Sequence, residues 1–125
     1  MATSLIDLTR RALPSVLLGG VLMAGSPGVW AETDAEMLAE GKKIAFDRKK
    51  GNCRACHLVD DGVSPGNLGP PLVAMKARFP QRDLLRAQIS DAQVKNPETI
   101  MPPFGRHGML SEAELEKVVD YVWSL

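Results

Sequence analysis

The sequence contains few of the features on which several common functions depend. Only two of its 125 residues are cysteine, so once that pair is occupied no thiol remains for a disulfide, a metal site or a nucleophile. The 15 basic and 15 acidic residues cancel, and this balance gives no indication of nucleic-acid binding. The sequence has no internal repeat, no low-complexity segment and no convincing strand before the cysteines. The chemistry must therefore come from a few residues, and the cysteine pair is the first candidate.

The two cysteines belong to the motif Cys53-Arg54-Ala55-Cys56-His57. This spacing is typical of covalent haem attachment, in which each thiol adds to one vinyl group and the histidine that follows is held beneath the iron. A thioredoxin-type dithiol is an alternative, but such pairs accompany a βαβ pattern. A zinc site needs four ligands, and beyond the motif only His107 and carboxylates remain. The motif predicts one covalently bound haem c, with Cys53 and Cys56 as thioether links and His57 as an iron ligand.

A haem bound through His57 needs a second axial ligand, and Met101 is the residue that we favour. It lies in Ile100-Met101-Pro102-Pro103-Phe104-Gly105, a predicted loop that the two prolines stiffen. A thioether ligand at this position would raise the reduction potential. The alternatives for the same role are Met75, Met109 and His107.

The first 31 residues have the three parts of a secretory signal peptide. An arginine pair at positions 10 and 11 precedes an apolar run over about residues 12–24, and small residues precede a cleavage site after Ala31. A membrane anchor is the alternative, but proline and glycine interrupt the run, which falls short of the ~20 apolar residues that a spanning helix needs. We expect cleavage after Ala31, export to the periplasm, and one domain over residues 32–125 without stable membrane insertion.

Two capping boxes predict the first and last helices. In Thr33-Asp34-Ala35-Glu36 and in Ser111-Glu112-Ala113-Glu114, the hydroxyl accepts from the glutamate's backbone N–H while the carboxylate reaches back. The first helix should end near Gly51. Helical spacing gives the last helix an apolar stripe, formed by Leu115, Val118, Val119, Val122 and Trp123. Because Gly41 has no side chain, we expect the two helices to cross there, with Tyr121 or Val118 lying over it.

A further helix should lie between these two. Pro80 is expected to begin it, and it should end before Asn96-Pro97. The residues expected to face inward are Leu84, Leu85 and Ile89. Proline-rich and glycine-rich loops make up the rest, so the sequence predicts an all-α domain of three to four helices around the prosthetic group.

Together these features resemble the class I cytochromes c across the whole of residues 32–125. The resemblance lies in the cysteine motif after the first helix, Gly69-Pro70-Pro71-Leu72 in the middle, Met101-Pro102 late, and an aromatic residue in the final helix. It implies that His57 is the proximal ligand and Met101 the distal one. It also implies that the carbonyl of Pro70 accepts a hydrogen bond from the other ring nitrogen of His57, which fixes the orientation of the imidazole.

A narrower resemblance is to SoxX, the small haem subunits of SoxAX thiosulfate-oxidising cytochromes. It rests on residues 51–57, 65–72, 96–105 and 118–125. The resemblance implies a SoxA-type cytochrome partner, a SoxYZ-type carrier protein whose cysteine receives thiosulfate, and a downstream small cytochrome c that takes the electrons. With no third cysteine, this chain would be a redox subunit of a thiosulfate-conjugating complex and would not be catalytic alone.

Two other functions share the haem residues. A free electron-shuttling cytochrome would differ only at its surface, where a ring of cations near the haem edge would favour docking. The candidate cations near the motif are Lys42, Lys43, Lys49, Lys50 and Arg54, although a solvated helix face also explains such a run. A sensing haem protein would need an open distal position, and Met101 argues against it.

Overall fold

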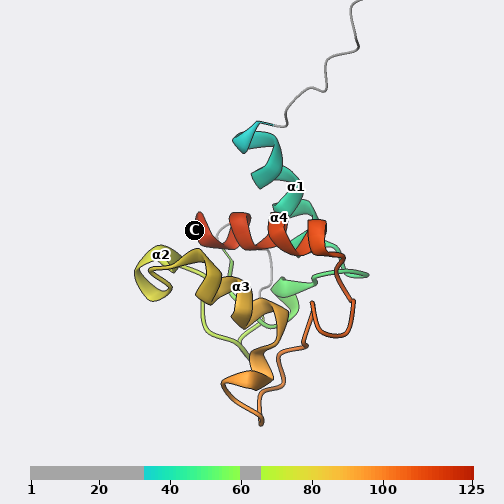
Figure 1. The fold of residues 1–125 in the computed structure, drawn as a ribbon, viewed down its shortest axis with the longest axis vertical. Helices are drawn as coiled ribbons and strands as arrows, with labels where there is room; N and C mark the ends of the chain where they lie inside the picture. Colours follow the sequence, from blue (N-terminus) through green and yellow to red (C-terminus); the bar gives the residue numbers. More distant parts are fainter. Residues whose placement is uncertain (1–32, 60–65) are drawn as a thin grey trace, which may run out of the picture. The chain divides into compact units, whose positions relative to one another are not determined.

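Four α-helices form the regular structure of the residues that the computed structural model describes, which are 33–59 and 66–125. The helices are α1 (Asp34–Phe46), α2 (Met75–Arg78), α3 (Arg82–Ser90) and α4 (Glu112–Trp123), as Figure 1 shows. Two 3₁₀ turns, η1 (Cys53–Ala55) and η2 (Ala92–Val94), complete the regular elements. Within these ranges the only β pairing is an isolated bridge between Val59 and Leu72. The predicted all-α fold is confirmed, whereas the predicted signal peptide lies outside the described residues.

Both predicted capping boxes are present. The hydroxyl of Thr33 accepts from the Glu36 N–H at 3.3 Å, and the Glu36 carboxylate accepts from the Thr33 N–H at 2.9 Å. Ser111 and Glu114 make the same reciprocal pair at 3.3 and 3.0 Å. Each box supplies partners for backbone groups that the first helical turn leaves unpaired. The starts of α1 and α4 are therefore fixed by residues within a single turn.

The end of α1 differs from the prediction, because the helix ends at Phe46 and not near Gly51. Asp47 follows in an extended conformation, and its carboxylate accepts the Lys49 N–H at 2.8 Å. The Gly51 N–H then donates to the Ile44 carbonyl at 3.2 Å. The Asp47 side chain thus accepts the Lys49 N–H in a turn, and this N–H no longer needs a carbonyl partner within the helix.

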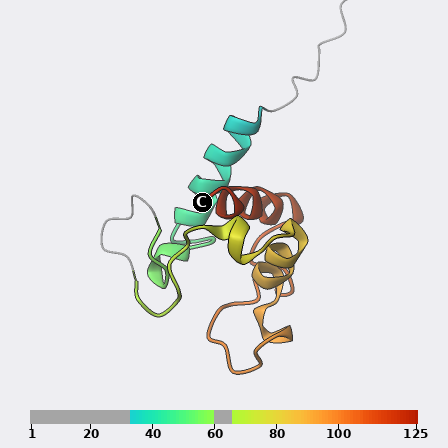
Figure 2. The same cartoon turned by 90° about the vertical axis from the view of Figure 1, so that its left-hand side faces the viewer.

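Helices α1 and α4 cross at Gly41, and Figures 1 and 2 show α4 running across α1. A Cβ added at Gly41 would lie 2.8 Å from the Cβ of Tyr121 and closer still to the Lys117 carbonyl oxygen. Nearby, the rings of Phe46 and Tyr121 meet edge to face, with centroids 6.1 Å apart. The predicted crossing and its contact with Tyr121 are confirmed, and the backbone of Lys117 is an additional contact.

The central helical region is shorter and more divided than predicted. Helix α3 starts at Arg82, two residues after Pro80, and ends at Ser90. Leu85 and Ile89 are buried as predicted, but Leu84 is exposed, which corrects its predicted inward position. The four-residue helix α2 was not predicted. Its N-cap, Ala74, has the left-handed conformation (φ 51°), which no helix-start pattern anticipates.

Ion pairs join α3 to α4 beside the apolar contacts. Arg82 Nε lies 2.5 Å from an Asp120 carboxylate oxygen, and Arg86 Nε lies 2.5 Å from a Glu116 carboxylate oxygen. Beneath them, both helices contribute to one buried cluster with the segments around the cysteine motif: Ala45, Val59, Leu72, Met75, Leu85, Ile89, Phe104, Leu110, Leu115, Val118, Val119, Tyr121 and Val122. None of the described helices is long and apolar enough to cross a membrane.

Candidate haem site

A cavity of about 540 Å³ lies beside this cluster and is bounded by segments from most of the domain. The residues that the sequence analysis singled out all line it: Cys53, Cys56, His57, Pro70 and Met101. These positions span 48 places in the sequence between Cys53 and Met101. The fold therefore brings the cysteine motif, the Pro70 segment and the Met101 loop to one cavity.

The cysteine motif reaches the cavity through a tight turn. Asn52 takes the left-handed conformation (φ 46°, ψ 33°), which asparagine tolerates better than most residues, and η1 begins directly after it. The backbone N–H groups of Cys56 and His57 both donate to the Cys53 carbonyl, at 3.2 and 2.9 Å. This turn places both thiols and the imidazole along the same wall of the cavity.

The surroundings of Cys53 differ from those of a reactive dithiol. Burial raises the pKa of the Cys53 thiol to about 11, so the thiol is neutral at ordinary pH. Dithiol oxidoreductases depend on a lowered cysteine pKa, which supplies the attacking thiolate. The site therefore does not support the thioredoxin-type alternative.

The imidazole of His57 is held by the Pro70 carbonyl. Its Nδ1 lies 2.7 Å from the Pro70 oxygen, which is the contact that the cytochrome resemblance implies. A carbonyl oxygen can only accept, so Nδ1 carries the proton and Nε2 keeps its lone pair. The protein alone therefore places His57 in the tautomer that binds a metal through Nε2.

Two glycines allow the Pro70 segment to lie against the motif, and the sequence analysis missed this role. A Cβ at Gly69 would lie 2.6 Å from His57 Nδ1, and one at Gly66 would lie 2.7 Å from the Cα of Cys56. Their N–H groups donate at 2.8 Å, from Gly66 to the Arg54 carbonyl and from Gly69 to the Cys56 carbonyl. The sequence does show two glycines on either side of Asn67-Leu68, but it does not show that the cysteine motif lies against them.

A second wall of the cavity, formed by the Met101 loop, carries Met101, whose backbone N–H donates to the Thr99 hydroxyl at 3.2 Å. Among the alternative distal ligands, Met75 is buried and Met109 is 46% exposed, and both also line the cavity. His107 does not line it. Its Nε2 lies 3.3 Å from Arg106 Nη2 instead. The structure thus brings three thioethers to the cavity and separates His107 from it.

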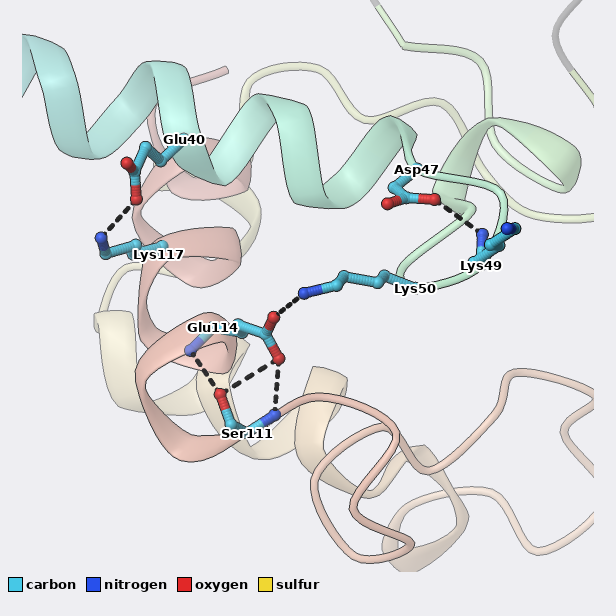
Figure 3. Close-up of polar contacts among 7 residues, drawn as sticks. All are labelled: Glu40, Asp47, Lys49, Lys50, Ser111, Glu114 and Lys117. Atoms are coloured by element: carbon cyan, nitrogen blue, oxygen red, sulfur yellow. Dashed lines mark hydrogen bonds and ion pairs between the residues drawn. The ribbon is translucent and has the colours of Figure 1, made fainter.

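An ion pair connects the segment before the motif to the start of α4. The Lys50 ammonium pairs with the Glu114 carboxylate, which also takes part in the capping box with Ser111 (Figure 3). The pKa of Glu114 is lowered to about 2, mainly by the hydrogen bond from Lys50 and next by the hydrogen bonds from Ser111. The carboxylate therefore stays charged at all but strongly acidic pH, and it neutralises one of the cations lining the cavity.

The cavity has the chemical character that a haem requires. Its walls are mainly apolar, with side chains that include Leu72, Phe79, Leu85, Ile89, Phe104, Leu110, Val118 and Val122. Besides Lys50, which pairs with Glu114, three cations line it and suit a macrocycle with two carboxylates: Arg48, Lys49 and Arg78. Cys53 and Cys56 would hold the macrocycle through thioether bonds and His57 Nε2 would bind its iron. The bound iron would supply one-electron redox chemistry.

The helical fold, the Cys53–His57 motif and the apolar cavity define a c-type cytochrome. The model of the family described as cytochrome C oxidase, cbb3-type, subunit III, matches residues 36–122, and the chain belongs to this family. Haem c binding and electron transfer follow from that membership. The chain is also similar to an uncharacterized lipoprotein of Aquifex aeolicus (strain VF5), at 33% identity over 75 residues. That match covers 59% of this chain but only 36% of the relative, so the two proteins share about one domain.

Proposed function

We propose that this chain is the electron-accepting haem subunit of a SoxAX-type complex in the periplasm. In this proposal Cys53 and Cys56 hold one haem c, His57 is its proximal ligand and Met101 its distal ligand. The resemblance to SoxX in the motif, the Pro70 segment and the Met101 loop supports the assignment. The leader of residues 1–31 would be removed on export, and the mass of the mature protein tests that step.

The surface around the cavity supports a lasting subunit over a free shuttle. Leu68, Ile100 and Met109 line the cavity and are 69%, 72% and 46% exposed, so a bound haem would cover part of each side chain and leave the rest at the surface. Exposed apolar side chains of this kind are typical of surfaces that a partner covers, and lasting interfaces are more apolar than transient ones. This apolar mouth of the cavity, defined by Leu68, Ile100 and Met109, is the observation that carries the proposal.

The ring of cations that would favour a free shuttle is incomplete in the structure. Lys50 is paired with Glu114 (Figure 3), and the cationic groups of Lys42 and Arg54 lie over the Phe46 ring, 5.6 and 4.9 Å from its centroid. Cation rings increase association rates through long-range attraction, and neutralised charges contribute little to that attraction. Of the five candidate cations, Lys50 is therefore neutralised by a carboxylate, while Lys42 and Arg54 keep their charge but are drawn to the Phe46 ring, and this reduction of the ring favours the subunit over the shuttle.

The reaction divides between the partners. A carrier cysteine thiol and thiosulfate form a sulfur–sulfur bond, releasing one proton and two electrons. This chain has no thiol beyond Cys53 and Cys56, so the sulfur chemistry belongs to a site on the SoxA-type subunit. The role of this chain is to accept the electrons one at a time and pass them to a small cytochrome c.

A carrier-mass assay tests this division. The purified holoprotein alone should accept electrons from a reductant yet leave the mass of the SoxYZ-type carrier unchanged. With a SoxA-type partner and an electron acceptor, the carrier should gain the mass of a thiosulfate group. Conjugation by this chain without any partner would refute the assignment.

A binding assay tests the apolar mouth. Ile100→Ser should weaken association with the SoxA-type partner at least tenfold, because the exposed side chain would be buried there. Val94→Ser is the matched control, since Val94 is 80% exposed but does not line the cavity. If Ile100→Ser and Val94→Ser weaken binding equally, the apolar mouth is not part of the interface. A holoprotein that purifies from its host as a monomer and reduces soluble acceptors would instead identify a free shuttle.

A further inference from the structure

Pro70 and Pro71 have no backbone N–H, so they can accept hydrogen bonds through their carbonyls but cannot donate any. The N–H groups on either side both donate to the motif segment at 2.8 Å, from Gly69 to the Cys56 carbonyl and from Leu72 to the Leu58 carbonyl. The two proline carbonyls are therefore the groups through which the segment's centre can be fixed.

Each of these carbonyls accepts a hydrogen bond from a different side chain. The Pro70 oxygen accepts from His57 Nδ1 at 2.7 Å, and the Pro71 oxygen accepts from Arg78 Nη1 at 2.6 Å. Arg78 is the last residue of α2, and its Nη1 also lies 3.4 Å from the sulfur of Met75, which is buried in the core. Through Arg78 the segment is tied to a helix outside the cysteine motif.

We propose that Arg78 is a positioning residue for His57. By holding the Pro71 carbonyl, it fixes the peptide units on which the adjacent Pro70 carbonyl depends, and so keeps that carbonyl aligned with His57 Nδ1. Loss of the guanidinium would leave the Pro71 oxygen without this partner and the segment would shift between its two ends. The inference rests on the proposed ligand role of His57 but not on the SoxAX role.

Hydrogen exchange at His57 separates positioning from charge. In the reduced holoprotein, NMR can follow how fast the Nδ1 proton of His57 exchanges with solvent. Arg78→Gln should speed this exchange at least tenfold, because the hydrogen bond to Pro70 opens more often. Arg48→Gln is the matched control. It removes the same charge from the cavity lining, yet Arg48 makes none of the hydrogen bonds that hold Pro70 and Pro71.

The outcomes are distinct. If Arg78→Gln leaves the exchange rate unchanged, or speeds it no more than Arg48→Gln does, Arg78 does not position His57 and the inference is wrong. If Arg78→Gln does not mature, Arg78→Lys provides the test, since its shorter reach to the Pro71 oxygen should still speed exchange about threefold. A native exchange rate in that variant would overturn the proposal. Failure of the proposed ligand role would appear earlier, as a native holoprotein without a low-spin, histidine-ligated haem spectrum.

Discussion

The two walls of the haem cavity are built in different ways. On the His57 wall, residues far apart in sequence hold one another, as in the bonds from His57 to Pro70 and from Gly69 to Cys56. On the Met101 wall, the nearest bond is local, from the Met101 N–H to the Thr99 hydroxyl, and the neighbouring Ile100 is exposed. On the first wall the tertiary bonds involve the ligand His57 itself, whereas on the second the nearest tertiary backbone bonds run from the Gly105 and Arg106 N–H groups to the Ser90 carbonyl, four and five residues after Met101. A substitution should therefore cost more on the His57 wall.

Gly69→Ala should have the largest effect. The added Cβ would lie 2.6 Å from His57 Nδ1, so the ring or the segment must move and the bond to Pro70 must break. Overpacking and a lost hydrogen bond together should lower the free energy of unfolding by about 3 kcal/mol. Denaturant unfolding and the yield of matured holoprotein measure this effect.

Gly108→Ala provides the comparison in the loop that follows Met101. Gly108 has a positive φ of 63°, and a Cβ there would meet no atom within 4 Å. Its cost should be only that of the left-handed backbone, about 1 kcal/mol. If Gly108→Ala lowers the free energy of unfolding more than Gly69→Ala does, the His57 wall is not the more tightly held of the two regions.

Met101→Ala should change the redox properties more than the fold. Without its thioether, the oxidised holoprotein should lose the weak near-infrared sulfur-to-iron charge-transfer band. The equilibrium should shift toward the oxidised form by at least tenfold, which is about 59 mV for one electron. Absorption spectroscopy and a redox titration provide the two measurements.

The other two thioethers on the cavity supply the controls for Met101. Met75→Ala should cost about 2–5 kcal/mol of stability, because Met75 is buried in the core, yet keep the band. Met109→Ala should do little to either property, since its side chain is half exposed. If the band survives in Met101→Ala and disappears in Met109→Ala, the distal ligand is Met109.

The smallest effect concerns the ion pair that joins the His57 wall to α4. The pKa of Glu114 is lowered from 4.5 to about 2 in the folded chain, so the unfolded chain binds the proton first as the pH falls. Its contribution to stability is therefore present above about pH 4.5 and lost as the pH approaches 2. As the pH falls from about 4.5 to about 2, the free energy of unfolding should decrease less in Glu114→Gln than in the native chain.

Glu112→Gln is the control for that measurement, because Glu112 lies in the same helical turn and pairs with Arg86 instead. The measurement is thermal unfolding of the native, Glu114→Gln and Glu112→Gln holoproteins between about pH 4.5 and pH 2. An unchanged pH dependence in Glu114→Gln would show that the pair with Lys50 does not contribute to acid stability.

The features that the sequence predicted correctly are those encoded within a few residues. Both capping boxes and the apolar stripe of α4 depend on spacing alone, and so does the cysteine motif. The end of α1 was misplaced because a side-chain bond from Asp47 competes with the helix. The short helix α2 and the exposure of Leu84 depend on which surfaces meet, and local propensity does not determine that.

The same limit applies to the candidate site. The resemblance to class I cytochromes supplied the contact between Pro70 and His57, which spacing alone does not give. The roles of Gly66 and Gly69 emerged only when the Pro70 segment was seen against the motif. Arg78 carried no sequence signal, because its hydrogen bond to Pro71 joins a helix that was not predicted. Contacts between segments therefore account for most of what the sequence did not reveal.

The capping box of α1 also bears on how this domain can be joined to other polypeptides. Thr33 and Glu36 satisfy each other's backbone groups, so the first turn of α1 needs no partner from residues before Thr33. An export leader, a lipid-bearing tether or a second domain can therefore be joined ahead of Thr33 without supplying the signal that begins the helix. The first helix can therefore begin in the same way behind upstream segments of different sequence.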